Sequence, residues 1–465
     1  LHHVGCTGYA HETARLFGAE LALNAAAARS NQTDPRDLFA TFLPMLTRGR
    51  PPLTRAKLAF TALTRGNSFG HAYTTAACEV GRDAARRLGL PETVQRSVYH
   101  GYEFWRGGGA PAGLGGDDIP VASRIARLTG IAALCDTVGG TDAAVEAIRR
   151  RGGGMLDPHL AAHFADRGPA LLDELNATDP RAEVLEAEPA PAVTVPDPQL
   201  VDVAAVFADL ADLKSPYTHG HSSGVAALAR AAGERLRLAP GAVADLEIAG
   251  LLHDLGRVAI SNAVWEKPGR LTADEWEQVR LHPYHSERIL AGSQRLAPLA
   301  RLAGMHHERL DGTGYHRGSQ AGELSMPVRV LAAADVYQAM TQDRPHRPAS
   351  PSEQAATLVR DRAREGSLDE DAVGAVLAAA GHAAAVPRRE PPAGLSDREV
   401  EVLALVAEGC SNAQIAERLV ISRRTAEHHV QHIYTKIGAS SRAAAALFAM
   451  QHDLLAGRGQ FVPDR

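Results

Sequence analysis

Histidine and carboxylate side chains recur through the middle third of the sequence, each beside an apolar stretch with helical character. The segments are "YTHGHSSGVAALA", "LLHDLGRV", "RLHPYHSERIL", "GMHHERLDGTGYHRG" and "LAAADVYQAM". They contribute His221, His253, Asp254, His282, His306, His307 and Asp335. An imidazole or carboxylate that is buried among apolar side chains needs a partner. Imidazoles and carboxylates together suit a first-row transition metal such as iron or manganese, or zinc.

This set of side chains is larger than one metal ion normally takes from a protein, and a carboxylate can bridge two ions. Two divalent ions a few ångströms apart would activate a water and neutralise the oxygens of a phosphoryl group during in-line displacement. A single helical histidine is more often a hydrogen-bonded core or surface residue than a ligand. The prediction of two divalent transition metal ions therefore depends on the whole set.

Joined in this order, the motifs identify a family. The segment from Lys214 to Arg347, through "KSPYTHGHS", "LLHDLGR", "HHERLDGTGY", "ADVYQAM" and "DRPHRP", resembles the HD-GYP family of metal-dependent phosphodiesterases, which hydrolyse cyclic di-GMP. The resemblance implies that the histidines and aspartates named above bind a di-metal centre. It implies that Asp254 is the bridging carboxylate and that Arg257 stabilises charge on the phosphate. It further implies substrate contacts from Arg257, Gly314, Tyr315, Arg344 and Arg347.

The sequence departs from the family pattern at two positions. Arg257 stands where lysine is usual, and arginine meets phosphate as a fork rather than a point charge. The Gly-Tyr-Pro motif reads Gly314-Tyr315-His316. Proline would stiffen this loop, whereas His316 restores a backbone donor. The loop lies near the substrate in the family, so the choice of cyclic dinucleotide is open.

The first third of the chain resembles a degenerate copy of the middle third. Setting "VYHGYEFWRGGGAP" against "GMHHERLDGTGYHRG" places Glu103 opposite Glu308, an offset of 205 residues. At that offset the positions of four metal ligands hold Ala77, Gly101, Tyr102 and Gly130. In the motif at the start of the chain, His2-His3 replaces His253-Asp254. One histidine pair cannot hold a dinuclear centre. The sequence predicts a degenerate HD-GYP-like domain without catalysis, truncated because nothing before Leu1 matches the helices that precede Leu252.

The last third predicts a DNA-binding domain. A helix capped by Ser396 and Glu399 ends near Gly409, a short helix starts at Asn412, and Ser422 caps a basic helix. Two helices joined by a tight turn, with the second helix basic on one face, are typical of a helix-turn-helix. The segment resembles the LuxR-type domain over its full length. The resemblance implies DNA contacts from Arg423, Arg424, Thr425, His428, His429 and Lys436, and a core of Ile415, Ala416, Leu419, Val420, Ile421, Val430 and Ile433.

Composition supports a multidomain helical protein. The chain has 465 residues, 45% of them hydrophobic and only 5% aromatic, and no segment shows sustained two-residue alternation. We therefore predict an all-α fold. Proline-rich stretches divide it into a degenerate domain (1–185), a linker (186–200), a phosphohydrolase domain (201–384), a linker (385–394) and a helix-turn-helix domain (395–465). Helix starts are predicted at two further caps, a Thr272–Glu275 box and a Ser350–Glu353 box with Pro351 at the first position.

The same data exclude several other classes of protein. The net charge of -5 gives no global attraction to nucleic acid, so DNA binding needs a local patch. Four scattered cysteines form no CxxC pair, and no apolar run is long enough to span a membrane. We expect a cytoplasmic protein with no membrane partner.

Together these patterns predict a transcriptional regulator with a di-metal phosphodiesterase domain, which hydrolyses cyclic di-GMP or a related cyclic dinucleotide. It would bind double-stranded DNA as a homodimer through its last helix. Two alternatives stay open: a non-catalytic transcription factor whose HD domains only bind nucleotide, and a hydrolase for another phosphorylated compound. The complete ligand set favours the enzyme, whereas the Gly-Tyr-His loop and the degenerate copy favour the sensor.

Overall fold

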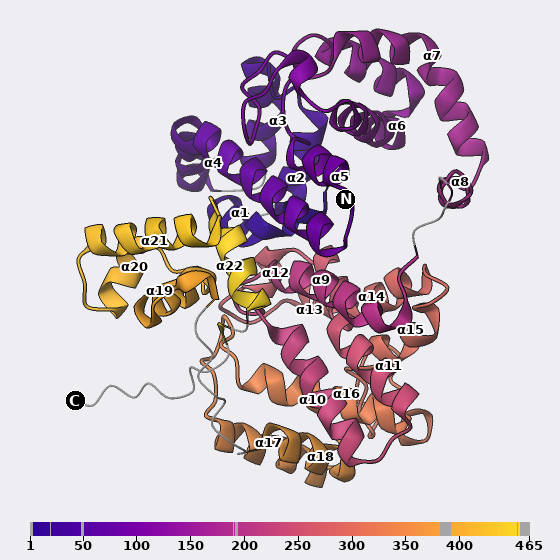
Figure 1. The fold of residues 1–465 in the computed structure, drawn as a ribbon, viewed down its shortest axis with the longest axis vertical. Helices are drawn as coiled ribbons and strands as arrows, with labels where there is room; N and C mark the ends of the chain where they lie inside the picture. The colour runs from indigo at the N-terminus through magenta and orange to yellow at the C-terminus, as the bar shows by residue number, and fades with distance from the viewer. Residues whose placement is uncertain are drawn as a thin grey trace. The chain divides into compact units, whose positions relative to one another are not determined.

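The chain forms two compact units in a computed structural model, residues 1–196 and 197–465. The structure describes residues 3–18, 20–47, 51–188, 190, 194–381, 392–452 and 454–455. All regular structure in these ranges is helical (Figure 1), which confirms the predicted all-α fold. No helix in them is long and apolar enough to cross a membrane. The predicted linker at 385–394 lies largely outside the described residues, and the domain limits stay predictions.

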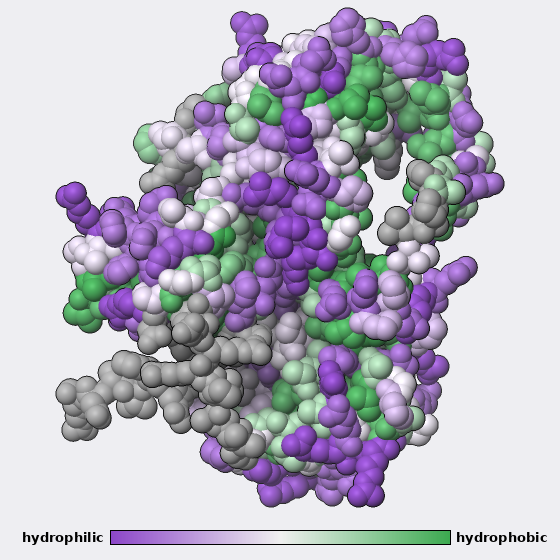
Figure 2. Space-filling model, in the orientation of Figure 1, coloured by the Kyte–Doolittle hydropathy of each residue, from purple (hydrophilic) through white to green (hydrophobic). Residues whose placement is uncertain are grey.

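The described residues of the first unit form eight helices and two 3-10 turns. They are η1 (Val4–Tyr9), α1 (Ala10–Phe17), α2 (Glu20–Arg29), α3 (Pro35–Thr47), α4 (Pro52–Arg87), α5 (Glu92–Tyr99), η2 (Gly116–Asp118), α6 (Val121–Arg151), α7 (Pro158–Ala177) and α8 (Pro180–Glu186). α6 bends at Gly140, where φ is 78°. Leu128, Ile148 and Phe164 join α6 to α7 in one apolar core. Apolar surface is visible in the region of α6 and α7 in Figure 2. Val138 of α6 and Leu171 of α7 are exposed.

The second unit begins with a larger helical domain. Its elements are η3 (Asp197–Gln199), α9 (Leu200–Asp212), α10 (His221–Arg235), α11 (Pro240–Leu252), η4 (Leu255–Ala259), α12 (Asn262–Trp265), α13 (Ala273–Arg280), α14 (His282–Ala291), α15 (Ala297–Gly304), η5 (Ala321–Glu323), α16 (Met326–Met340), α17 (Ser352–Arg364) and α18 (Glu370–Ala380).

Alanine and glycine set the close packing of this domain. Val225, Ala229, Leu246 and Leu331, from α10, α11 and α16, are fully buried in one core. A Cβ atom added at Gly250 of α11 would lie 2.7 Å from the Cα atom of Ala226 in α10. Only a residue without a side chain allows that approach, since interiors pack at crystal-like density. The abundance of alanine in the sequence therefore reflects helices in near-backbone contact.

The two units repeat the same local contacts at the offset of 205 residues. Glu308 accepts a hydrogen bond from the Arg317 amide at 2.8 Å, and Glu103 accepts one from the Ala112 amide at 2.9 Å. The Tyr315 amide donates to the His307 carbonyl at 3.2 Å, and the Ala110 amide donates to the Tyr102 carbonyl at 3.3 Å. The buried glutamate and its loop therefore have one backbone arrangement in both units.

The helix-to-helix contacts around these loops also correspond. Arg329 pairs with Asp369, the N-cap residue of α18, and Arg124 pairs with Asp157, the N-cap residue of α7, both at 2.8 Å. A Cβ atom at Gly256 would lie 2.0 Å from the His282 carbonyl oxygen. A Cβ atom at Gly5 would lie 1.9 Å from the Ala77 carbonyl oxygen. His3 lies two residues before Gly5, as Asp254 lies two residues before Gly256. His2, the predicted counterpart of His253, lies outside the described residues.

A four-helix domain closes the chain. η6 (Pro392–Gly394) precedes α19 (Asp397–Ala407), α20 (Asn412–Arg418), α21 (Arg423–Ile437) and α22 (Arg442–Gln451). The predicted Ser396–Glu399 capping box, the stop at Gly409 and the Ser422 cap are confirmed. Ser422 accepts from the Thr425 amide, and Gly438 ends α21 with φ at 69°.

Two predictions of local structure were wrong. α17 starts at Ser352 with Pro351 as its N-cap, so Ser350 does not cap it. Instead the Ser350 amide donates to the Met340 carbonyl, closing the loop after α16. Val420, predicted as core, is 91% exposed with φ at 53°. It lies in the tight turn between α20 and α21, where the reversal of the chain turns its side chain outward. The Thr272–Glu275 box is confirmed at the start of α13.

Candidate metal centre

Three histidines occupy equivalent places, each just beyond the end of a helix. His253 follows α11, His282 follows α13 and His306 follows α15. In each, Nδ1 lies within hydrogen-bond distance of the carbonyl oxygen three residues earlier: Gly250 at 2.7 Å, Val279 at 2.6 Å and Ala303 at 2.7 Å. A carbonyl only accepts hydrogen bonds, so Nδ1 carries the proton. In a neutral ring with its proton on Nδ1, the Nε2 lone pair is available on the opposite side.

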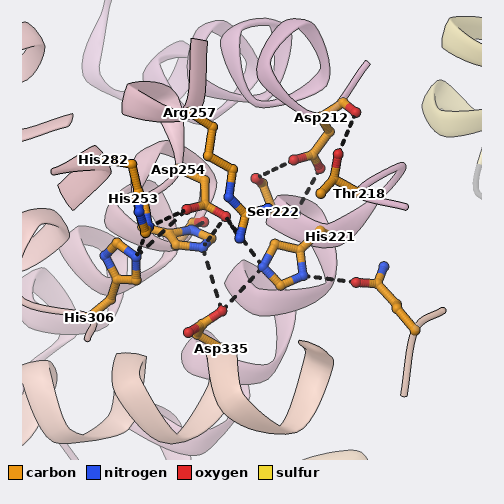
Figure 3. A network of polar contacts seen from close by, with 12 residues as sticks. Asp212, Thr218, His221, Ser222, His253, Asp254, Arg257, His282, His306 and Asp335 are labelled. Carbon is orange, nitrogen blue, oxygen red and sulfur yellow. Dashed lines mark hydrogen bonds and ion pairs between the residues drawn. The ribbon is translucent and has the colours of Figure 1, made fainter. Parts of the chain in front are cut away.

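The remaining ligand candidates come from three other elements. His221 is the first residue of α10, and its Nδ1 lies 2.9 Å from the Gln342 side-chain oxygen. Asp335 lies on the buried face of α16, and His307 follows His306. The Nε2 atom of His221 is 3.2 Å from Asp335 Oδ1, and Nδ1 of His307 is 3.7 Å from Asp335 Oδ2. The structure therefore brings all the predicted ligands into one cluster (Figure 3 shows all but His307).

Asp254 lies at the middle of this cluster, and its two oxygens face different histidines. Oδ2 is 3.0 Å from Nε2 of His253 and 3.4 Å from Nε2 of His221. Oδ1 is 3.3 Å from Nε2 of His282 and 3.6 Å from Nε2 of His306. One carboxylate with each oxygen directed at a separate pair of imidazoles could be shared by two cations.

The donor atoms fit metal ions better than they fit one another. Nε2 of His282 and Nε2 of His306 are 3.2 Å apart, although both rings place their proton on Nδ1. Two lone pairs at that distance repel unless a cation lies against both. Nε2 of His221, Nε2 of His253 and Oδ1 of Asp254 are buried without a hydrogen-bond partner. Buried polar atoms without partners are costly, and a pair of divalent ions would satisfy them.

The protonation states also suit metal binding. Burial lowers the pKa of His221 to about 4 and the pKa of His306 and His307 well below the ordinary value, so these rings are neutral. Burial alone would raise the pKa of Asp254, but Arg257 and His253 hold it well below its usual range. Neutral imidazoles and ionised carboxylates are the forms that bind divalent cations.

Arg257 is the cation nearest to this centre. Its Nη2 is 2.7 Å from Asp254 Oδ2, and its guanidinium lies 4.9 Å from the ring centre of Trp265. Its Nε and Nη1 atoms are buried without a partner. A guanidinium held by one carboxylate and one aromatic ring has donors left for the oxygens of a phosphate.

The predicted Gly-Tyr-His loop lies against the histidines. The Tyr315 ring is 4.6 Å from the His307 ring and 6.3 Å from the His282 ring. A Cβ atom at Gly314 would lie 2.5 Å from the Arg309 amide nitrogen, so the turn needs glycine. The following peptide bond, Tyr315–His316, is cis. The loop thus sets an aromatic ring beside the cluster.

Arg344 and Arg347 differ in their surroundings. Arg344 donates to the Tyr217 carbonyl at 2.7 Å, next to the start of α10. Burial lowers its pKa to about 10, which leaves it charged at neutral pH. Arg347 donates to the carbonyls of Ala339 at 2.6 Å and Met340 at 3.3 Å, so it closes the end of α16. A substrate contact from Arg347 stays a prediction that competes with these bonds.

Sequence reasoning missed the polar residues that support the ligands. Ser286 donates to the His253 carbonyl at 2.5 Å and accepts from the Gly256 amide at 2.8 Å, which joins α14 to the loop that carries Asp254. Asp212 accepts from the amide and the hydroxyl of Ser222 at 2.8 Å, and burial raises its pKa to about 7. The position of Ser286 four residues after His282, on the same helical face, was the one available signal.

The predicted DNA contacts lie on or near the exposed face of α21. Arg423, Arg424, Thr425 and His428 are exposed and His429 is half-buried. Arg423 pairs with Glu427 in the next turn at 3.1 Å. Lys436 is held inside the domain, because its Nζ donates to Glu399 at 2.7 Å and to the Gly394 carbonyl at 2.9 Å.

Family comparisons agree with these two arrangements. Residues 205–372 match the family of HD domains, and residues 393–449 match the bacterial regulatory proteins of the luxR family. The chain joins an HD domain to a LuxR-family domain. The described core of the latter includes the predicted Ile415, Ala416, Val430 and Ile433, all buried, with Leu419 and Ile421 half-buried.

Several curated proteins are similar to the HD-containing part. The 3'3'-cGAMP-specific phosphodiesterase 3 of Vibrio cholerae is 35% identical over 302 residues, which is 64% of this chain and 66% of that protein. A cyclic di-GMP phosphodiesterase of Pseudomonas aeruginosa is 40% identical over 132 residues, or 28% of this chain and 32% of that protein. The chain thus spans about two thirds of the first relative and a third of the second.

A solved structure extends the similarity. The crystal structure of a cyclic GMP-AMP specific phosphodiesterase from Vibrio cholerae has 27% sequence identity and a TM-score of 0.51, over 82% of this chain and 92% of that one. That span is longer than the second unit alone, so the likeness reaches into the first unit.

Proposed function

We propose that the HD domain is a metal-dependent phosphodiesterase acting on a cyclic dinucleotide, and that the LuxR-family domain binds double-stranded DNA as its output. The observation that carries the proposal is the placement of Asp254. Each of its oxygens faces a separate pair of imidazoles, and a guanidinium lies on the same carboxylate. A structural site for one ion would need neither the second pair nor the arginine.

The ligands are proposed to divide into two sets that share Asp254. His221, His253 and Asp335 form one group whose ligand atoms lie within 4.8 Å of one another, and His282, His306 and His307 form another. Two divalent ions bound there supply Lewis acidity toward phosphoryl oxygens and lower the pKa of a coordinated water. Nitrogen and oxygen donors without sulfur favour iron or manganese, with zinc possible.

The remaining residues are proposed to bind and orient the phosphodiester. Arg257 would direct its unpartnered donors at a non-bridging oxygen, and Arg344 adds a second charge beside α10. Tyr315, beside His307, would stack on a base or cover the site, while Gly314 gives the loop its close turn. The loop of this chain carries His316 and not proline, so we propose the class of cyclic dinucleotides rather than one member. The named relatives act on 3'3'-cGAMP and on cyclic di-GMP.

A direct test uses the full chain loaded with manganese or iron. It is incubated separately with cyclic di-GMP and 3'3'-cGAMP, and linear or mononucleotide products are separated by chromatography. We expect product from at least one of them and none after Asp254→Asn. The matched control is His285→Gln, which changes a histidine on the same helix as His282 but outside the cluster.

The same experiment distinguishes the phosphodiesterase from a non-catalytic nucleotide sensor. Metal-loaded wild-type protein that binds either dinucleotide, forms no product and changes its DNA affinity would contradict the phosphodiesterase. Product from another phosphodiester only would retain the enzyme and replace the substrate class. In the sensor outcome, restored turnover in His316→Pro would assign the defect to the loop.

DNA binding is proposed from the exposed basic start of α21, which is the helix that enters the major groove in this type of domain. We place the protein in the cytoplasm, where its DNA target lies, and propose a homodimer through α22. Most apolar residues of α22 are buried in their own domain, while Ala444 and Phe448 are half-exposed and would form the contact. Light scattering on the full chain measures the mass that tests the dimer.

A further inference from the structure

The first unit contains a large cavity at the place that corresponds to the metal centre of the second unit. Its volume is about 730 Å³, within the range of about 300 to 1,000 Å³ that is usual for small-molecule sites. Its lining includes His3, Tyr102, Gly109 and Gly130. At the offset of 205 residues the last three correspond to His307, Gly314 and Asp335, and His3 takes the place of Asp254 in the aligned motif.

Small residues at the ligand positions open this space. Gly130 stands where α16 carries Asp335, and a Cβ atom added at Gly130 would have no atom within 4 Å. Gly101 and Ala77 replace two of the histidines. The frame around them is kept, as the equivalent bonds of Glu103 and Arg124 show. The centre has thus lost its metal-binding side chains while its walls have stayed apart.

Most of the wall is apolar. Phe17, Leu23 and Leu46 belong to one buried cluster, with Phe42 and Phe69 packed against it, and all five line the cavity. Phe39, on α3, lines the cavity and is 50% exposed, which marks a route to solvent. Apolar side chains on the wall favour an apolar occupant, because its binding removes apolar surface from water.

One end of the cavity is cationic. Arg127 on α6 is 6% exposed, and among the described residues it forms no ion pair with a carboxylate. Its Nη1 donates to the Gly101 carbonyl at 3.2 Å, its Nη2 lies 3.4 Å from the Gln32 side-chain oxygen, and its Nε has no partner. Its guanidinium lies 5.2 Å from the Tyr102 ring.

This charge is an addition in the first unit. The corresponding position of the second unit is Ala332, a buried core residue. A buried guanidinium without a carboxylate partner is strongly unfavourable unless an anion reaches it. Burial lowers the pKa of Arg127 to about 10, so it stays protonated at neutral pH.

We propose that the first unit is a ligand-binding domain whose cavity takes an apolar organic anion of the fatty-acid type. The chain or ring system of the ligand lies among the phenylalanines and leucines, and its acidic group lies against Arg127. The proposal does not depend on catalysis by the HD domain.

Calorimetric titration of the full chain with dodecanoate and with dodecanol tests the site. Wild-type protein is expected to bind dodecanoate saturably with one site per chain and at least about tenfold more tightly than the neutral alcohol. Arg127→Met is expected to remove that preference. Arg149→Met, an exposed arginine on the same helix, is the matched control and should change nothing.

A second variant separates cavity binding from a folding defect. Gly130→Leu fills the open space without meeting another atom at its Cβ, and helices tolerate leucine better than glycine. We expect it to fold as wild type by circular dichroism and to lose binding of both probes. Wild-type protein without saturable dodecanoate binding, or a folded Gly130→Leu variant with unchanged affinity, overturns the proposal. If Arg127→Met fails to fold, Gly130→Leu and the dodecanoate-to-dodecanol ratio of wild type decide it.

Discussion

Replacing Gly256 by alanine should remove one of the two proposed metal ions. The added methyl group would lie 2.0 Å from the His282 carbonyl oxygen and 2.6 Å from the Ser286 amide nitrogen. Ordinary contact begins near 3.4 Å, so η4 and the start of α14 must separate by about 1.4 Å, because both clashing atoms are backbone. His282 moves with α14, while Asp254 moves with η4.

A separation of that size is large compared with metal-ligand tolerances of about 0.2 Å. Nε2 of His282 lies 3.3 Å from Asp254 Oδ1, and opening this distance disturbs the ion on that side. His221, His253 and Asp335 do not belong to α14, so the other ion should stay. We expect metal content to fall from about two ions to about one per chain, with stability lower by about 1–3 kcal/mol.

Elemental analysis after dialysis against metal-free buffer measures the first effect, and urea unfolding measures the second. Gly374→Ala is the control, because it lies on the exposed side of α18 with no atom within 4 Å of an added Cβ. It should be neutral or more stable by up to about 1 kcal/mol. A Gly256→Ala protein with two ions per chain and wild-type stability would refute the packing argument.

Three further changes probe the supporting contacts and the DNA-binding domain. Ser286→Ala leaves a buried amide at Gly256 and a buried carbonyl at His253 without hydrogen-bond partners. Urea unfolding should therefore show a free energy of unfolding that is lower by about 2–5 kcal/mol. The control Ser352→Ala, at an exposed position, should change it little. Burial alone would raise the pKa of Glu399, but bonds from Lys436, the Ser396 amide and hydroxyl, and His432 lower it to about 2. A carboxylate with a lowered pKa stabilises the fold above its unfolded value near 4.5 and loses that effect as pH falls toward 2. Glu399→Gln should therefore be less stable than wild type at pH 6, and thermal unfolding should show the difference shrinking between pH 4.5 and 2. Arg424→Ala should weaken binding to a DNA fragment and reduce the salt dependence by about one phosphate contact, measured by fluorescence anisotropy at several salt concentrations.

Each of these predictions has an outcome that contradicts it. Equal stability of Ser286→Ala and Ser352→Ala would mean that water replaces the hydroxyl. A pH-independent difference for Glu399→Gln would show that packing, and not charge, holds α19 to α21. Lys436→Ala is the comparison for Arg424→Ala, because Lys436 is engaged with Glu399. A larger loss of salt dependence in Lys436→Ala would reverse the assignment of the two residues.

Much of the metal centre could be predicted from the sequence because its ligands are tied to local signals. His253, His282 and His306 stand at helix ends within recognisable motifs, and the structure brings them to one carboxylate. Capping boxes at Thr272 and Ser396 were equally local and were correct. Such features depend on only a few neighbouring residues, so they can be predicted from a short stretch of sequence.

The remaining features depend on contacts that distant segments make. The residues near Ser350 do not show that its amide donates a hydrogen bond to the Met340 carbonyl. This bond holds Ser350 in the loop after α16, and α17 starts at Ser352. The hydrophobicity of Val420 suggested burial, but the turn between α20 and α21 exposes it. The proposed role of Arg127 could not be predicted from the sequence, since only the folded unit shows that no carboxylate of the described residues pairs with it.

The placement of the histidines at helix ends bears on how such a domain can change during evolution. Each of them donates from Nδ1 to a carbonyl in the last turn of the preceding helix and faces the centre with Nε2. The contacts that hold the helices together, such as Arg329 with Asp369 and Glu308 with its loop, are made by other residues. Ligands can therefore be exchanged one at a time without unfolding the domain. The same arrangement of helices can then hold metal ligands in one copy and a cavity that can evolve a different ligand preference in the other.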